Sequence, residues 1–305
     1  MPGPALRILA VVVLTTVVAA CGSEPRNLVQ EPAAAPTIGD EAGVIAEPTT
    51  AAAPSQQPAP TAPPPQPAAA TPGWVLGATP LPKGPDGTPL VLPTPPALRD
   101  RRLTAPDRLP PPGDAVYRSS ATPIDAALAT RMGTTWQPGC PVPLADLRHV
   151  TLSFWGFDGR PHTGELVVNA KVAADVQKVF GTLFTARFPL EDVRVVEPAD
   201  LAAEPTGDGN TTAAFVCRPV RGSTSTPSAH SSGLAIDINP FQNPYKKGKS
   251  VLPELAGAYL DRSLVWPGMI RKGDVVTRAF AEAGWTWGGS WTSTKDTMHF
   301  SANGR

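Results

Sequence analysis

The chain has 305 residues and carries 26 Lys and Arg residues against 26 Asp and Glu residues, so its formal net charge at pH 7 is zero. This balance provides no basic field for a nucleic acid or for an anionic membrane surface, and we expect no nucleic-acid partner. The length allows one large domain or two smaller ones. The distribution of its 39 prolines limits how much of the chain can form a core.

The first 20 residues have the features of an export signal. Arg7 supplies a positive charge, and residues 8–18 form an apolar run that is well below the ~20 residues needed to span a bilayer. The following Ala-Ala-Cys-Gly resembles a bacterial lipobox, which implies cleavage before Cys21 and a lipid on its sulfur. An ordinary signal peptide or a short membrane anchor is the alternative. We expect a lipoprotein of the bacterial cell envelope, anchored to the outer face of the membrane, and export under either interpretation.

Proline and alanine dominate the next part of the chain. Residues 24–113 contain 23 of the 39 prolines, and such a composition buries too little apolar surface to offset the entropy of ordering the chain. We predict a disordered or polyproline-like linker over residues 21–113 and one domain over residues 114–305. The linker would let the domain work within the cell wall, or it would serve only as a spacer.

Two cysteines remain once Cys21 is assigned to a lipid. In an oxidising compartment Cys140 and Cys217 are more often paired than free, so we predict a disulfide between them. Two buried thiols are the alternative. Zinc–thiolate coordination is disfavoured because neither cysteine belongs to a CxxC pair.

Strand patterns occur in three parts of the domain. Residues 147–154 alternate in polarity, Asp158-Gly159 offers a turn, and residues 164–168 form the returning strand of a hairpin. The segment VRVVEPAD (193–200) predicts another strand. The aromatic and glycine-rich segment 285–301 predicts strands joined by a tight loop.

Helical spacing of apolar residues occurs twice. It predicts a helix over residues 172–184, with Asn169 as its N-cap. A second helix is expected to start at Asp274 and to end at Gly284. Because strands and helices segregate along the chain, the sequence favours an α+β domain with a small antiparallel sheet and flanking helices.

The segment SAHSSGLAID (228–237) holds the first candidate site residues. Asp237 lies between Ile236 and Ile238, where a carboxylate is costly unless a nearby group compensates its charge. If residues 234–239 form a strand, His230 lies at its mouth and both side chains can point at one spot. An imidazole nitrogen and a carboxylate oxygen are suitable ligands for Zn²⁺.

Two further residues near the C-terminus complete the pattern. His299 would give a third ligand and leave one position for water, which is the arrangement of catalytic rather than structural zinc sites. Asp296, three residues earlier, is the candidate general base and acid. Buried, hydrogen-bonded polar residues without a metal are the alternative. For His149 and His162 we expect structural or surface roles.

These residues and their flanks resemble a known family. Ser228-x-His230-x-x-Gly233-x-Ala235-x-Asp237, followed by Asp296-x-x-His299, is similar to the motif of zinc peptidases that cut peptidoglycan stem peptides. That family contains VanY-type D-Ala-D-Ala carboxypeptidases and L-alanyl-D-glutamate endopeptidases. Four flanking segments of the sequence also resemble the endopeptidase-like branch of this family: NTTAAFVCR (210–218), INPFQNPY (238–245), YLDR (259–262) and GWTWGGSW (284–291).

The resemblance implies roles for individual residues. His230, Asp237 and His299 would hold zinc, Asp296 would act as acid and base, and Arg218 would steady the oxyanion, with Arg221 as a rival. The fold implied is the one shared by lysostaphin-type enzymes, D-Ala-D-Ala peptidases and the hedgehog domain. Ser228 would orient the site by hydrogen bonding without contacting the metal. The candidates for lining a substrate groove are Trp287, Trp291 and Tyr259.

The resemblance implies hydrolysis of an amide bond in peptidoglycan stem peptides by metal-activated water. We expect the enzyme to be monomeric. Either an L,D-endopeptidase or a D,D-carboxypeptidase is expected, and the flanking segments favour the endopeptidase slightly. The alternative is a cell-wall peptide-binding lipoprotein that keeps the fold and the zinc but does not hydrolyse. A structural envelope lipoprotein without metal is a further alternative.

Overall fold

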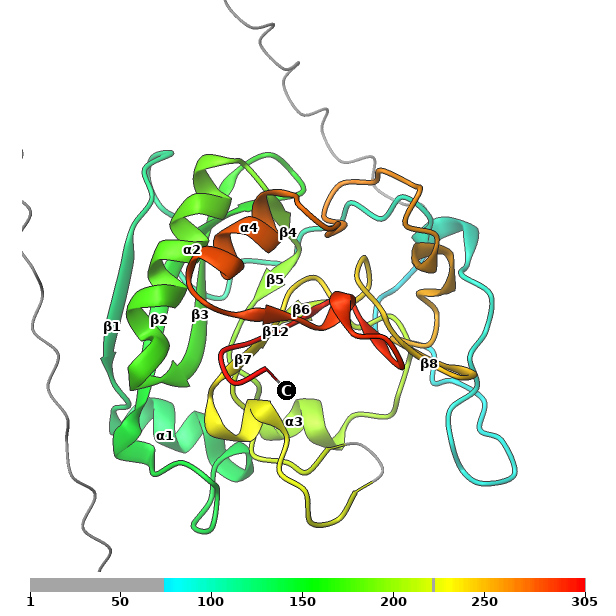
Figure 1. Ribbon diagram of the computed structural model, residues 1–305, viewed down its shortest axis with the longest axis horizontal. Coiled ribbons are helices and arrows are strands. Elements are labelled where there is room, and N and C mark those ends of the chain that lie inside the picture. Colours follow the sequence, from blue (N-terminus) through cyan, green and yellow to red (C-terminus); the bar gives the residue numbers. More distant parts are fainter. Residues whose placement is uncertain (1–73, 221–222, 305) are drawn as a thin grey trace, which may run out of the picture. The chain divides into compact units, whose positions relative to one another are not determined.

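The computed structural model describes residues 74–220 and 223–304, which belong to one compact unit of the chain. The predicted signal, Cys21 and the linker up to residue 73 lie outside the described residues. The described part combines helices with small, mainly antiparallel sheets, which confirms the predicted α+β class (Figure 1). Among its helices, none has the length and apolar character required to span a bilayer.

The largest sheet is built on the predicted hairpin. Strands β2 (Leu147–Gly156) and β3 (Pro161–Asn169) pair antiparallel, and Gly159 takes a positive φ of 73° in the turn between them. The order of the sheet is β1-β2-β3, and both β1 (Ser119–Pro123) and the short parallel strand β4 (Pro189–Leu190) pair with β2.

Helix α2 (Ala173–Thr185) covers one face of this sheet, and helix α4 (Val275–Glu282) packs against α2 (Figure 1). Helix α2 follows a 3₁₀ turn, η4 (Ala170–Val172), whereas helix α4 follows Asp274 directly. Alternate residues of β2, such as Val150 and Leu152, share one buried cluster with apolar side chains of both helices. This cluster is the main core of the described part of the chain.

The predicted helix ends agree with the structure in most respects. The Asp274 carboxylate accepts a hydrogen bond from the Thr277 amide at the start of α4, and Gly284 follows the helix with a φ of 79°. The Asn169 side chain accepts from the Lys171 amide and therefore caps η4 rather than α2. The chain makes this one extra turn before the α-helix begins.

The predicted strand over residues 193–200 is wrong for most of its length. Only β5 (Asp192–Val193) forms, and it pairs in parallel with β6 (Thr211–Thr212). Residues Pro198–Ala202 form helix α3 instead. Pro198 suits the first turn of a helix, where no amide donor is needed, and Glu197 and Asp200 form a capping box there.

Two three-stranded sheets carry the C-terminal half. The first has the order β10 (Thr286–Trp287), β12 (His299–Ser301), β7 (Ala235–Asp237), and the second the order β11 (Lys295–Asp296), β8 (Tyr245–Lys247), β9 (Ser250–Leu252). The aromatic, glycine-rich C-terminal segment thus forms three short strands, as predicted. The remaining helices are α1 (Ala126–Met132), η1 (Pro96–Leu98), η2 (Gly133–Thr135), η3 (Leu144–Asp146), η5 (Ala229–Ser232), η6 (Gly257–Leu260) and η7 (Gly288–Ser290).

Cys140 and Cys217 form a disulfide, which confirms the predicted pair. The bridge joins the loop after η2 to the segment that immediately precedes Arg218. A backbone hydrogen bond from the Cys217 amide to the Thr135 carbonyl, 2.9 Å long, supports the same junction. The disulfide therefore fixes the chain at the point where the candidate arginine begins.

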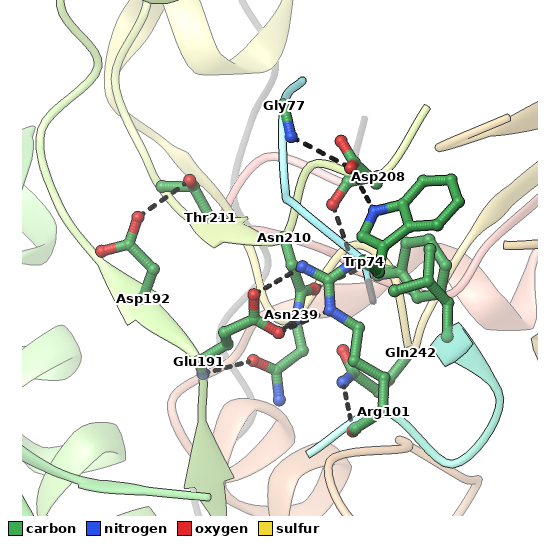
Figure 2. A network of polar contacts seen from close by, with 12 residues as sticks. Trp74, Gly77, Arg101, Glu191, Asp192, Asp208, Asn210, Thr211, Asn239 and Gln242 are labelled. Atoms are coloured by element: carbon green, nitrogen blue, oxygen red, sulfur yellow. Dashed lines mark hydrogen bonds and ion pairs between the residues drawn. The ribbon is translucent and has the colours of Figure 1, made fainter. Parts of the chain in front are cut away.

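The domain does not begin at residue 114, because part of the predicted linker packs onto it. The Trp74 indole and the Gly77 amide both donate to the buried Asp208 carboxylate, at 2.9 and 3.0 Å (Figure 2). Leu81 and Leu98 lie in a second buried cluster. Overall composition predicted a linker here, whereas a few well-placed apolar and polar anchors suffice to hold an extended, proline-rich segment.

A buried ion pair is the strongest of these anchors. Arg101 and Glu191 are 1% and 3% exposed, and the Arg101 Nε donates to Glu191 Oε2 at 2.8 Å while Nη2 donates to Oε1 at 2.5 Å (Figure 2). The Arg101 Nη1 donates to the Asp208 carbonyl, and Asn210 donates to the same Glu191 carboxylate. Every charged atom of the pair thus has a partner, which is the condition for burying an ion pair without a large penalty.

Candidate active site

Three side chains from two parts of the sequence meet where β12 pairs with β7 in the β10-β12-β7 sheet. His299 and Asp237 are directly opposite each other in the antiparallel pairing of β12 with β7. His230 comes from the turn η5, just before β7. One ligand atom from each of the three residues lies within 4.8 Å of the others. The structure therefore brings together the three residues for which the sequence predicted one site.

Local hydrogen bonds fix the orientation of His230. Its Nδ1 lies 2.6 Å from the Ala214 carbonyl oxygen, which leaves Nε2 facing Asp237 Oδ2 at 3.3 Å. The Ser228 hydroxyl accepts from the His230 amide at 3.3 Å and so caps the turn. Gly233 ends the turn with a φ of 67°, at a place where a Cβ would lie 2.6 Å from the Asn169 amide nitrogen. Only glycine fits this position without strain.

The two imidazoles compensate the charge of Asp237. Its neighbours Ile236 and Ile238 are fully buried, and its Oδ1 lies 3.1 Å from His299 Nδ1. Burial opposes the charged form, but His230 and His299 hold the pKa of the Asp237 carboxyl well below its usual range. The carboxylate is therefore ionised and has its two oxygens directed at two different imidazoles.

Asp296 lies next to this cluster, and its pKa is shifted in the opposite direction from that of Asp237. Burial and the charge of Asp237 raise its pKa to about 7, while His299 and Arg218 oppose the rise. Its Oδ1 is buried and has no hydrogen-bond partner among the described residues. A buried acceptor without a partner is costly unless a ligand or water fills the role. A carboxyl group with this pKa can both accept and release a proton near neutral pH.

The Arg218 guanidinium lies within electrostatic reach of the site, since it lowers the pKa of Asp296. It is exposed, and its Nη1 donates to the Pro219 carbonyl at 3.2 Å. The Arg218 carbonyl in turn accepts from the Ser228 amide, which connects the arginine to the turn that carries His230. Arg221, the rival candidate, lies outside the described residues.

The donor set fits a divalent cation. Two imidazoles and one carboxylate would supply three protein ligands: His230 through Nε2, His299 through a ring nitrogen and Asp237 through its oxygens. Ligand histidines commonly give their other ring N–H to a backbone carbonyl, and His230 has this arrangement with Ala214. The partnerless oxygen of Asp296 is consistent with a further ligand beside the cluster.

The other two histidines have structural partners, as expected. His149 Nε2 lies 2.8 Å from a Glu165 carboxylate oxygen. The buried His162 lies between Asp107 and Asp158, with one ring nitrogen facing each carboxylate. Neither belongs to the cluster of possible metal ligands found among the described residues.

The three aromatic residues proposed for a substrate groove lie in different environments. Trp291 is half-buried, and its ring centroid is 5.5 Å from that of His299, so it borders the site. Trp287 packs against the core residue Phe300 and donates its indole N–H to the Thr297 carbonyl. Its role is therefore mainly structural.

The expectation for Tyr259 is wrong. This side chain is fully buried in the second apolar cluster, and its hydroxyl accepts from the Arg101 amide at 2.6 Å. A residue that is sealed from solvent in this way cannot line a groove. Its hydroxyl instead helps to hold the N-terminal segment.

Gly288 allows η7 to pack closely on Asp296. A Cβ on Gly288 would lie 2.7 Å from the Asp296 carbonyl oxygen and 3.0 Å from its Cβ. We expect Gly288→Ala to destabilise the fold by about 1–3 kcal/mol, because backbone atoms cannot move aside cheaply. Urea unfolding would measure the change, with Gly209→Ala, where a Cβ has open space, as the control. Equal stability of the two variants would contradict this account.

Two contributors to the site were not predicted from the sequence. The Ala214 carbonyl orients His230, and a backbone acceptor of this kind leaves no signal in residue types. Tyr245 lies directly opposite Asp296 in the pairing of β11 with β8. It ends the segment INPFQNPY, which carried part of the family resemblance, so that segment was the available signal.

Comparison with known proteins agrees with this geometry. Residues 221–302 match the family model described as D-alanyl-D-alanine carboxypeptidase. The matched segment contains His230, Asp237, Asp296 and His299, whereas Arg218 lies just before it. The searches of curated proteins and of solved structures gave no match. The match supports the resemblance predicted from the motifs: the C-terminal segment 221–302 is similar to the D-alanyl-D-alanine carboxypeptidase family of peptidases.

Proposed function

We propose that this protein is a zinc-dependent peptidase that hydrolyses an amide bond in the stem peptides of peptidoglycan. The family match supports a peptidase. The observation that carries the proposal is the convergence of His230, Asp237 and His299 beside the buried carboxyl of Asp296. A ligand cluster alone would also suit a structural metal, but an adjacent acid with a pKa of about 7 suits proton transfer.

Zinc is the metal that the donor set favours. Two histidines and one carboxylate, with room for a non-protein ligand, are typical of catalytic zinc sites. When bound, zinc would polarise the scissile carbonyl and lower the pKa of a coordinated water towards 7.

The chain's own residues would manage the proton and the developing charge. Asp296 would take the proton from the attacking water at its partnerless Oδ1 and return it to the leaving amine. Arg218, whose charge already acts on Asp296, would stabilise the negative oxygen formed at the carbonyl. We expect no acyl-enzyme, because the proposed nucleophile is water rather than a side chain. The hydroxyls of Ser231 and Ser232, the nearest serines after His230, already donate to the backbone carbonyls of Ser228 and Ala229.

The bond and the location belong to the same proposal. The substrate is a stem peptide, which the enzyme cuts either as an L,D-endopeptidase or as a D,D-carboxypeptidase. The flanking segments favour the endopeptidase. We further propose an exported enzyme held at the outer face of the membrane by a lipid on Cys21, which lies outside the described residues. A proline-rich linker would then join the lipid to the domain.

Metal analysis and a peptidoglycan digest test the proposal. The purified protein should contain about one zinc per chain, because the three ligands form one site. A chelator should abolish hydrolysis, and added zinc should restore it. Mass analysis identifies the bond: free D-alanine indicates a carboxypeptidase, and new amino termini within the stem indicate an endopeptidase.

A matched pair of histidine variants serves as control. His230→Ala should lose both zinc and activity, whereas His149→Ala, which removes a histidine paired with Glu165, should keep both. Absence of metal from the wild-type protein would contradict the proposed cofactor. Zinc binding without any hydrolysis would favour the peptide-binding alternative instead.

A further inference from the structure

The small sheet β11-β8-β9 has two faces, and the Asp296 side chain projects on only one of them. Asp296 lies opposite Tyr245, and Lys295 lies opposite Lys246, in the antiparallel pairing of β11 with β8. Directly opposed residues project to the same face of a sheet, and residues two apart along a strand also share a face. Lys247 therefore projects on the face of Tyr245 and Asp296, whereas Lys246 projects on the other face.

Lys247 is close enough to the site to contact a bound substrate. Asp296 and Lys247 are diagonal neighbours across the two strands, and the Cβ atoms of such pairs are typically about 7–8 Å apart. This separation is within reach of a long side chain. In Figure 1, β8 lies next to the C-terminal segment that carries β11 and β12.

The charge of Lys247 is not used within the described part of the chain. The side chain is exposed, and no ion pair found among the described residues involves it. The cations that lower the pKa of Asp296 are His299 and Arg218, and Lys247 is not one of them. The exposed cation is therefore available to an anionic ligand that lies alongside the site.

We propose that Lys247 binds a carboxylate of the substrate close to the scissile amide. This proposal rests on the proposed peptidase function and adds a requirement on the substrate: an acidic group within about one residue of the bond that is cut, given the 3.8 Å between successive Cα atoms. The carboxylate has two sources in a peptide. It is either the free C-terminal carboxylate or the side chain of an acidic residue, and the first would make the enzyme a carboxypeptidase.

The test compares Lys247→Gln with Lys246→Gln, which removes the same charge from the same strand on the opposite face. Lys247→Gln should raise KM for an acidic stem peptide about 10- to 100-fold, because one hydrogen bond to a charged group is lost, and should leave kcat nearly unchanged. Lys246→Gln should change neither value by more than about twofold, since its half-buried side chain projects on the face away from Asp296. Unfolding curves of both variants check that the fold is intact.

Paired peptides identify the source of the carboxylate. One pair differs only in a C-terminal carboxylate or amide, and the other only in an acidic side chain or its amide. Wild-type protein should prefer the charged member of one pair, and Lys247→Gln should abolish that preference. An unchanged preference in Lys247→Gln, or equal losses in both variants, would overturn the proposal.

Failure of the proposed function gives a different result. If the zinc-loaded wild-type protein cleaves none of the peptides, the peptidase proposal fails by itself. Calorimetric binding of the same paired peptides to wild type and both variants then tests Lys247 without turnover. Binding of the charged peptides that is insensitive to Lys247→Gln would reject the carboxylate site.

Discussion

Replacing Asp296 with asparagine should lower kcat about 10²- to 10⁴-fold, which is the usual contribution of a positioned general acid–base residue. Asparagine keeps the size of the side chain but cannot accept and release a proton. The zinc content should stay near that of the wild-type protein, because the three proposed ligands are untouched. Steady-state kinetics with a cleaved peptide, together with metal analysis, would measure both quantities.

The pH profile adds a readout that a structural role would not change. The wild-type rate should fall towards acidic pH, since a protonated Asp296 cannot accept a proton, and the variant should lack this limb. Lys295→Gln, the neighbouring residue on the opposite face of β11, is the matched control and should keep normal kinetics. An unaltered kcat in Asp296→Asn would remove this residue from catalysis, and loss of zinc would make it a ligand instead.

Replacing Arg101 with alanine should destabilise the fold by about 3–5 kcal/mol, the typical cost of removing one partner of a buried ion pair. Glu191, which is 3% exposed in the intact protein, loses its cation, and Asn210 still donates to it. Alanine also removes the bond to the Asp208 carbonyl and the stacking of the guanidinium over Phe241, whose centroid lies 4.5 Å away. Chemical denaturation of wild type and variant would measure the difference.

The pH dependence of this loss identifies its cause. Burial raises the pKa of Glu191, and Arg101 is a main group that opposes the rise. Without Arg101 the folded-state pKa moves further above the unfolded value, so stability is retained at low pH and lost as pH rises. The deficit should therefore be larger above neutral pH than in mildly acidic buffer. Arg102→Ala is the control and should cost less than about 1 kcal/mol, because Arg102 and its partner Asp100 are both partly open to solvent, with side chains 35% and 41% exposed. Equal losses in the two variants would contradict the role of Arg101.

Local patterns were sufficient where the interacting residues are close in sequence. The hairpin of β2 and β3 follows from alternation and a turn at Asp158-Gly159, and both partners lie within about 20 residues. The helix α4 follows from its own cap, Asp274, and its own apolar spacing. The strand expected over residues 193–200 failed because Pro198 and the capping box around it favour a helix start, a signal that the prediction did not weigh.

The linker boundary shows the opposite case. Composition treats residues 74–113 as one proline-rich stretch, yet Trp74, Leu98 and Arg101 bind partners more than 80 residues away. Tyr259 was misplaced for the same reason, since the Arg101 amide and an apolar cluster seal it from solvent. Such contacts depend on which surfaces meet, and no periodicity within a segment records that.

The sequence by itself determined the chemistry of the site: which residues could hold a cation, which acid lies beside them and which family they resemble. Only the tertiary structure decided that β12 pairs with β7, which sets His299 opposite Asp237 across 62 residues of chain. It also decided that the Asp296 carboxyl, whose Oδ1 is buried, lies near the charge of Asp237, and burial and this charge raise its pKa to about 7. The physical reason is that residue type fixes what a side chain can donate or accept, whereas burial and neighbouring charge fix whether it does so.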